Sequence, residues 1–244
     1  MARDWTIYEK NQLIKHGLAD HDLTQYDEAP VEYITGWAPF LDDEFEVTPD
    51  VLIPRVETAD LVELAEEIVL GKNKVRLADI GTGSGCIGIT LMKRLEKNKV
   101  EVEAYLSDIS EKALGVARKN AGRILGEKSN LLFLESDLFS GYPEIKFDLV
   151  IANLPYIPSS RLPTLDRSVI QFEPVIALGG GPDGLAVIKR FLQKLDKYLG
   201  DDGKAVLEID ESHLLDNFKE FTQYKLEIRT DQYGKNRFLL ISQK

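Results

Sequence analysis

The chain has 244 residues, a formal net charge of −11 and one cysteine, Cys86. This length is enough to bury a full hydrophobic core in one large domain or two small ones. The acidic balance, with no run of Lys and Arg, argues against direct binding of a long nucleic-acid duplex. The single cysteine excludes an internal disulfide and fits a reducing compartment.

Metal and membrane sites are not expected. The histidines His16, His21 and His213 show no metal-ligand spacing. The first residues, MARDWTIYEKNQ, lack the apolar core of a signal peptide, and no stretch approaches the ~20 apolar residues of a membrane span. We therefore expect a cytoplasmic monomer without membrane contact.

Residues 1–50 differ from the rest of the chain and are expected to form a short extension. They are aromatic, acidic and irregular. Residues 5–16 (WTIYEKNQLIKH) favour one short helix, and residues 39–55 (PFLDDEFEVTPDVLIPR) are typical of a hairpin or paired edge strands. Residues 51–244 are predicted to form the main domain.

Helix and strand patterns alternate through the main domain. Helical spacing of apolar residues occurs over 57–71, 86–96, 110–126, 183–200 and 212–221, and strand-like runs occupy 75–81, 101–108, 130–137, 147–155 and 203–210. This order predicts a Rossmann-like α/β fold with a mostly parallel sheet covered on both faces by helices. Two closing strands within 224–242, joined by a turn at Gly234, predict an antiparallel edge strand.

A glycine-rich loop follows the first strand of this domain. DIGTGSGCIG places Gly81, Gly83 and Gly85 between a strand and a helix, where glycine lets a ligand approach the backbone and the helix N-terminus offers free amides. A dinucleotide site would need its third glycine one residue later. The spacing is instead similar to the S-adenosylmethionine site of seven-strand methyltransferases.

Three strands of the predicted sheet end on aspartates. Asp79 precedes the glycine loop, Asp108 closes the next strand and Asp137 the one after. Each could be a solvated strand end, but ligands of such sheets bind beyond the carboxyl ends of the strands. We expect Asp108 to hold the two ribose hydroxyls of an adenosyl cofactor and Asp137 to meet the adenine amine.

A fourth strand ends on Asn153-Leu154-Pro155-Tyr156. The Asn153 side-chain oxygen and the Leu154 carbonyl could each accept one N–H of a planar amine or amide, which would point its nitrogen at a methyl group. Tyr156 could stack on that flat group, and Pro155 stiffens the turn. The alternative is that these residues form an ordinary turn at a strand end.

Several segments together resemble the release factor glutamine methyltransferases. They are PVEYITGWAPF, VLIPRVET, DIGTGSGCIGI, FDLVIANLPYI, FEPVIAL and a closing D-x-x-G-x-x-R of Asp231, Gly234 and Arg237. The resemblance runs from about residue 30 to the C-terminus. It implies transfer of a methyl group from S-adenosylmethionine to a glutamine side-chain amide in a peptide-chain release factor, with S-adenosylhomocysteine as product.

The resemblance also implies roles for particular residues. The cofactor would be bound by Asp79, Gly81, Thr82, Gly83, Ser84, Gly85, Asp108, Asp137, Leu138 and Asn153. Catalysis would depend on Asn153, Leu154, Pro155 and Tyr156, and the substrate would contact Arg55, Thr58, Asn153, Tyr156, Phe172 and Glu173. An ion pair with one of the many acids is the alternative for Arg55.

Two departures from the family pattern and two other functions stay open. Leu154 stands where the family usually has proline, which removes a restraint on φ but keeps the carbonyl. Only about thirty residues precede the match, where the family commonly has a larger helical region that holds the release factor. A methyltransferase acting on an exocyclic amine of RNA or DNA would use the same loop, and a non-catalytic binding module would retain only the fold.

Overall fold

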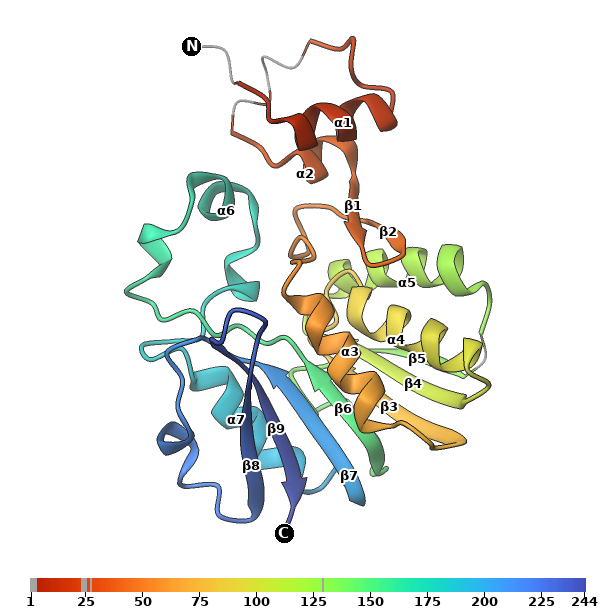
Figure 1. The fold of residues 1–244 in the computed structure, drawn as a ribbon, viewed down its shortest axis with the longest axis vertical. Coiled ribbons are helices and arrows are strands. Elements are labelled where there is room, and N and C mark those ends of the chain that lie inside the picture. Colours follow the sequence, from red (N-terminus) through yellow and green to blue (C-terminus); the bar gives the residue numbers. More distant parts are fainter. Residues whose placement is uncertain (1–3, 23–25, 27, 129) are drawn as a thin grey trace.

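A computed structural model describes residues 4–22, 26, 28–128 and 130–244. Its centre is a seven-stranded sheet in the order β5-β4-β3-β6-β7-β9-β8 (Figure 1). The strands are β3 (Lys74–Ile80), β4 (Glu101–Asp108), β5 (Leu131–Glu135), β6 (Phe147–Ala152), β7 (Leu199–Glu208), β8 (Tyr224–Thr230) and β9 (Asn236–Gln243). The predicted α/β, Rossmann-like architecture is confirmed.

The C-terminal strand β9 is the antiparallel member of the sheet. It runs antiparallel to both β7 and β8, while β3, β4, β5, β6 and β7 pair in parallel. The prediction of an antiparallel strand is therefore confirmed, but its place at the edge was wrong. β9 lies between β7 and β8, so the strand at this edge of the sheet is β8.

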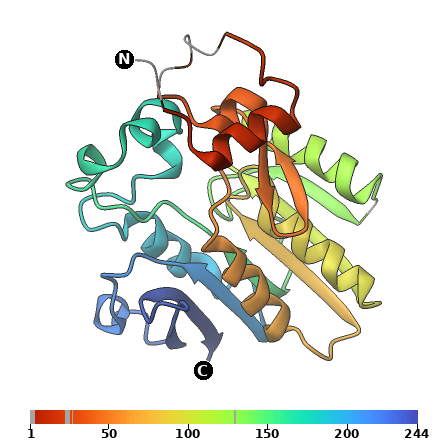
Figure 2. The same ribbon diagram turned by 45° about the horizontal axis from the view of Figure 1, so that its top comes forward.

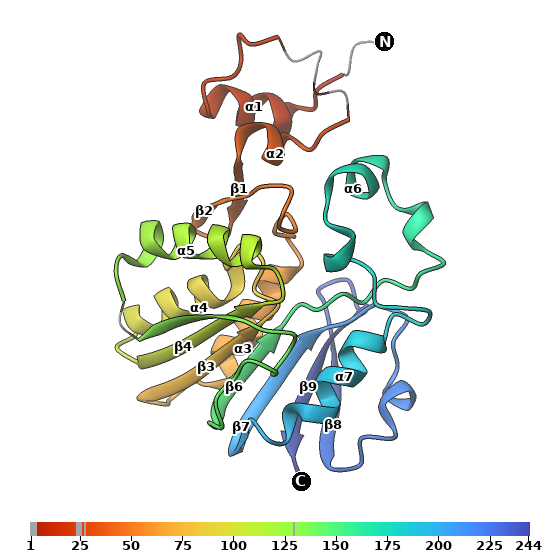
Figure 3. The same ribbon diagram turned by 180° about the vertical axis from the view of Figure 1, so that it is seen from behind.

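Helices cover both faces of the sheet. α3 (Thr58–Ile68), α4 (Cys86–Lys97) and α5 (Glu111–Leu125) lie on one face, and α7 (Ala186–Leu195) lies on the other, as the views from front and back show (Figures 1 and 3). Neighbouring residues of a strand face opposite sides, so Leu77 joins the core under α3 and α4, while Ala78 joins the core under α7. Two buried cores hold the sheet rigid between them.

The part of the extension that the structure describes, residues 4–22, 26 and 28–50, contains two α-helices and a hairpin. These are α1 (Ile7–Lys15), α2 (Val31–Thr35), β1 (Trp37–Phe40) and β2 (Asp43–Glu46). The predicted helix and hairpin are confirmed, although the hairpin begins at Trp37. Asn120 of α5 ties the hairpin to the main domain, because its amide bonds both the N–H and the C=O of Glu46 and also the C=O of Ser84 in the glycine loop.

The segment between β6 and α7 lies at the same end of the sheet as the extension (Figure 2). It contains the short helices η2 (Leu162–Thr164), α6 (Arg167–Phe172) and η3 (Val175–Ala177). An ion pair of 3.3 Å between Arg167 and Glu28 joins α6 to the extension. Both segments therefore stand beyond the carboxyl ends of the parallel strands.

One predicted helix, over 212–221, was wrong. The structure has only a 3-10 turn, η4 (Leu215–Phe218), in this segment. The Asn217 side chain accepts the Leu214 N–H at 2.7 Å, a local bond that competes with helix formation. No helix of the described ranges is both long and apolar enough to span a bilayer.

Candidate active site

The glycine loop connects β3 to α4 in a conformation that requires its glycines. Gly81, Gly83 and Gly85 have φ angles of 74°, 55° and 84°. A Cβ on Gly85 would lie 2.5 Å from Cδ1 of Ile89, whereas a Cβ on Gly83 would meet nothing within 4 Å. Gly85 therefore allows close packing of the helix, and the backbone at Gly83 is open to a ligand.

Asp79 supports this loop from beneath. It is fully buried, and its Oδ2 accepts hydrogen bonds from Thr82 Oγ1 (2.6 Å) and Gly88 N–H (3.0 Å). Its Oδ1 has no partner among the described residues. Burial raises the pKa of the Asp79 carboxyl to about 7. Asp79 does not line the cavity described next, so direct contact with a cofactor stays a prediction, and its visible role is to hold the loop.

A cavity opens at the carboxyl ends of β3, β4, β5 and β6. The walls come from segments far apart in the sequence: residues 50–55 and 58, residues 80–84, 86 and 87, residues 108–110 and 113, residues 136–138, residues 153–155, and Pro174, Ile176, Ala177, Val187 and Arg190. The structure thus brings most of the expected site residues to one place. Gly85, Tyr156, Phe172 and Glu173 lie outside the cavity wall, like Asp79.

Asp108 stands at the rim of the glycine loop, as the strand pattern predicted. Its Oδ2 accepts the Gly83 N–H at 2.9 Å and its Oδ1 accepts the Ser110 N–H at 3.0 Å. Partial burial raises the pKa of this carboxyl. Each oxygen has a further lone pair, so the carboxylate can accept two additional donors from the cavity.

Asp137 and Leu138 form another part of the wall. Asp137 is ion-paired with Arg190 of α7, so one of its oxygens is already engaged. Leu138 is 5% exposed and has a positive φ of 55°, which turns the chain sharply at this wall. Together they give an apolar surface next to a paired carboxylate.

Asn153 follows the last residue of β6 and points toward a buried acid. Its Nδ2 donates to Glu208 Oε2 at 3.0 Å and to Thr58 Oγ1 at 3.2 Å. No hydrogen bond among the described residues uses the Asn153 Oδ1 or the Leu154 carbonyl oxygen. Leu154 itself is 4% exposed and packs in the core under α7.

Glu208 is the residue of this site that the sequence analysis missed. It is 1% exposed and also accepts hydrogen bonds from Tyr156 Oη (2.8 Å) and Thr58 Oγ1 (2.9 Å). Burial raises the pKa of its carboxyl, and the same burial, with Glu208 nearby, raises the pKa of Tyr156. The signal in the sequence is an acid, Glu208, near the end of the strand-like run GKAVLEID.

Arg55 and Glu173, expected at the substrate entrance, contact each other. Arg55 Nη2 lies 2.5 Å from Glu173 Oε1, with Arg55 lining the cavity and Glu173 buried behind it. The structure therefore shows the ion pair that was the alternative for Arg55, and contact of Arg55 with a substrate stays a prediction. This pair links the loop before α3 to the segment after α6.

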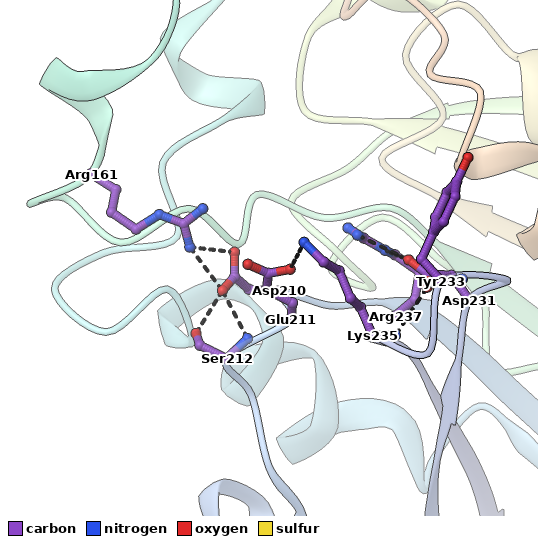
Figure 4. A network of polar contacts seen from close by, with 8 residues as sticks. All are labelled: Arg161, Asp210, Glu211, Ser212, Asp231, Tyr233, Lys235 and Arg237. Atoms are coloured by element: carbon purple, nitrogen blue, oxygen red, sulfur yellow. Dashed lines mark hydrogen bonds and ion pairs between the residues drawn. The ribbon is translucent and has the colours of Figure 1, made fainter.

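The D-x-x-G-x-x-R motif lies in the β8–β9 turn, and Figure 4 shows its Asp231 and Arg237. Asp231 accepts the N–H groups of Tyr233 (2.9 Å) and Lys235 (3.0 Å), and its other oxygen lies 3.3 Å from Nε and Nη2 of Arg237. Gly234 has the positive φ of 76° that this turn needs. The motif therefore places the Arg237 charge near the end of β7.

The same end of β7 holds the segment that follows Asn153–Tyr156. Arg161 donates to both oxygens of Asp210 at 2.9 and 2.7 Å, and Ser212 donates to the same carboxylate (Figure 4). Glu208 and Asp210, two residues apart, thus secure neighbouring parts of the chain from one strand end.

Comparison with known proteins agrees with this architecture. The model of the methyltransferase small domain matches residues 59–170. The structure of a ribosomal protein L11 methylase from Lactobacillus delbrueckii subsp. bulgaricus superposes with a TM-score of 0.56 at 20% identity, over 78% of this chain and 80% of that one. The fold is that of the class I methyltransferases, which use S-adenosylmethionine.

Sequence relatives define the family more closely. The chain is 38% identical to the release factor glutamine methyltransferase of Lactococcus lactis subsp. lactis, over 87% of this chain and 77% of that protein. It is also 38% identical to the protein of that name from Leptospira interrogans, over 95% and 81%. The chain belongs to the release factor glutamine methyltransferase family.

Proposed function

We propose that this protein transfers a methyl group from S-adenosylmethionine to the side-chain amide nitrogen of a glutamine in a peptide-chain release factor. The observation that carries the proposal is a pair of unbonded acceptors, the Asn153 Oδ1 and the Leu154 carbonyl, on residues that line the same cavity as the glycine loop. Family membership supports the choice of a glutamine amide as acceptor.

The cavity wall has the chemistry that the methyl donor requires. Gly83 leaves its backbone open, Asp108 keeps free lone pairs for two hydroxyl groups, and Leu138 provides an apolar wall. Both cationic side chains of the wall, Arg55 and Arg190, are paired with acids, so the cavity suits a cation better than a polyphosphate. When bound, S-adenosylmethionine supplies an electrophilic methyl group on a sulfonium.

An amide nitrogen is a poor nucleophile because its lone pair is delocalised, and the acceptors on Asn153 and Leu154 would compensate for this. Asn153 and Leu154 would each accept one N–H of the glutamine amide, which orients the nitrogen toward the methyl group. The same two oxygens stabilise the positive charge that develops on nitrogen, and the surplus proton leaves to solvent afterwards. No general base is needed for the attack itself.

Tyr156 would pack its ring against the glutamine amide. Its hydroxyl is bonded to Glu208, which fixes the direction of the ring, but the ring does not line the cavity in this structure. Stacking on the substrate therefore requires the glutamine to enter past the end of Pro155.

The release factor would bind over the mouth formed by the extension and the segment between β6 and α7. Thr58 and Arg55 line the cavity, and the Arg55–Glu173 ion pair joins them to the segment after α6. We propose that Phe172 and Glu173 contact the substrate from that segment. We propose that residues 1–50 help to hold the release factor. A monomer acting in the cytoplasm is the corresponding expectation.

Mass spectrometry tests this function. Candidate release factors are incubated with the protein and isotopically labelled S-adenosylmethionine, and the modified residue is located. A labelled methyl group on a glutamine side chain supports the proposal. Label on naked RNA or DNA at a comparable rate would favour the exocyclic-amine alternative instead. Absence of both, with no heat of S-adenosylmethionine binding in calorimetry, would indicate a binding module.

A further inference from the structure

We propose that Thr58 and Glu208 are positioning residues that fix the direction of the Asn153 amide, so that its oxygen and not its nitrogen faces the acceptor nitrogen. This inference rests on the proposed function and deepens it. It concerns residues on α3 and β7 that are 150 positions apart in the sequence and bond each other at 2.9 Å.

The hydrogen bonds determine where the nitrogen and the oxygen of the Asn153 side-chain amide lie. Glu208 Oε2 can only accept when ionised, and it lies 3.0 Å from the Asn153 terminal nitrogen. Thr58 gives its hydroxyl hydrogen to Glu208, so its oxygen keeps lone pairs for the second N–H of Asn153 at 3.2 Å. Both N–H groups are thereby engaged, and the oxygen is left for the cavity.

The reversed amide would be unfavourable in the same surroundings. It would place the Asn153 oxygen against the Glu208 carboxylate and lose both hydrogen bonds. Without these partners the two orientations of an amide differ little, since oxygen and nitrogen have nearly the same size. A reversed amide would also present N–H groups to the N–H groups of a glutamine and could not accept from them.

Glu208 is well held for this purpose. Ala152 and Leu207 are the last paired residues of the parallel strands β6 and β7, so Asn153 and Glu208 follow them side by side. The second Glu208 oxygen accepts the Tyr156 hydroxyl at 2.8 Å, and the carboxylate is almost fully buried. The sheet register, fixed by the two cores, therefore sets the distance between the acid and the amide.

Three substitutions of threonine test the proposal. Glu208 is a poor first target, because its removal leaves three donors, on Thr58, Asn153 and Tyr156, without their acceptor and risks unfolding. Thr58→Val removes the hydroxyl at nearly constant volume, Thr58→Ser keeps it, and Thr90→Val removes another buried hydroxyl, one with no partner in the described structure. We expect kcat for glutamine methylation to fall about ten- to a hundredfold in Thr58→Val, with the S-adenosylmethionine Kd unchanged. Thr58→Ser and Thr90→Val should stay close to the unsubstituted protein.

A second readout needs no substrate. The side-chain amide of Asn153 is identified in NMR spectra by its loss in Asn153→Ala, and its hydrogen exchange is measured without ligand. Exchange should be slow in the unsubstituted protein and in Thr58→Ser, and faster in Thr58→Val, because one of its two acceptors is gone. A merely structural role of Thr58 would lower stability without changing this exchange in the folded protein.

The two readouts separate this proposal from the proposed function. If no release factor is methylated at all, the function fails while the exchange measurement still decides the role of Thr58. If Thr58→Val keeps the kcat of the unsubstituted protein, or if its Asn153 amide exchanges as slowly, Thr58 does not position Asn153. Equal loss of kcat in Thr58→Ser and Thr58→Val would likewise overturn the role of the hydroxyl.

Discussion

Replacement of Asp108 by alanine should remove much of the affinity for S-adenosylmethionine. The Asp108 carboxylate lines the cavity, and its Oδ2 accepts the Gly83 N–H while its Oδ1 accepts the Ser110 N–H. Two hydroxyl groups of a ribose can therefore donate to the remaining lone pairs. Hydrogen bonds to a charged group contribute about 1.5 to 3 kcal/mol each.

The lower end of this range is appropriate, because the carboxylate is partly exposed and its burial already disfavours the charged form. Two such bonds then amount to about 3 kcal/mol, which is roughly a hundredfold in Kd. Loss of the bonds to Gly83 and Ser110 also loosens the loop and adds to this effect.

Isothermal titration calorimetry measures the Kd directly, and circular dichroism checks that the variant is folded. Asp148→Ala is a matched control. Asp148 also accepts a backbone N–H, from Arg76 at 2.8 Å, but it lies near the start of β6, at the end of the strands that is remote from the cavity. It should lower stability without changing the Kd. An unchanged Kd in folded Asp108→Ala would refute the assignment of Asp108 to the cofactor.

Three further results are expected. Burial raises the pKa of Asp79 to about 7, so the stability that its protonated carboxyl contributes is full below about pH 4 and is lost as the pH rises through 7. The difference in unfolding free energy between Asp79→Asn and the unsubstituted protein, measured by urea titration, should therefore shift in favour of Asp79→Asn from pH 5 to pH 8. The same difference at both pH values would contradict this. Leu154→Pro keeps the carbonyl and removes an N–H that donates no hydrogen bond among the described residues, but it also removes a side chain that is 4% exposed. We therefore expect kcat to hold while the unfolding free energy falls by about 1 to 3 kcal/mol. A tenfold loss of kcat in the folded variant would show that the leucine is needed for turnover. Methylation of a release factor should depend only modestly on salt between 50 and 200 mM, as no phosphate backbone is bound; a loss of a thousandfold would indicate a nucleic-acid substrate.

The order of elements and the carboxyl edge of the sheet could be predicted from the sequence, because both depend on local patterns. Residues 101–108 are predicted as a strand and form β4 with those bounds, and the helix predicted over 110–126 is α5, with Ser110 as its N-cap. Once four strands ended at one edge, Asp108, Asp137 and Asn153 had to lie near one another. The glycine loop was similarly evident from its place between strand and helix.

Other features depend on distant contacts and could not be read from the chain. Glu208 at the end of β7 accepts a hydrogen bond from Asn153, which follows the neighbouring strand β6. Only the strand order shows that these two residues lie side by side. The hydrogen bond from Thr82 to the fully buried Asp79, which holds the glycine loop, could likewise not be read from the strand pattern. β9 pairs with β7 on one side and with β8 on the other, and the sequence of two closing strands does not specify which of them takes this inner place.

The central claim is that Asn153 accepts a hydrogen bond from a glutamine amide during methyl transfer. Its most direct test compares Asn153→Ala with the unsubstituted protein in single-turnover methylation of a release factor, followed by mass spectrometry of the glutamine, with donor binding measured in parallel. We expect the folded variant to bind S-adenosylmethionine normally and to methylate glutamine about a hundred- to a thousandfold more slowly, or not at all. Near-normal glutamine methylation by Asn153→Ala would contradict the account and leave Asn153 as a residue that merely ends a strand.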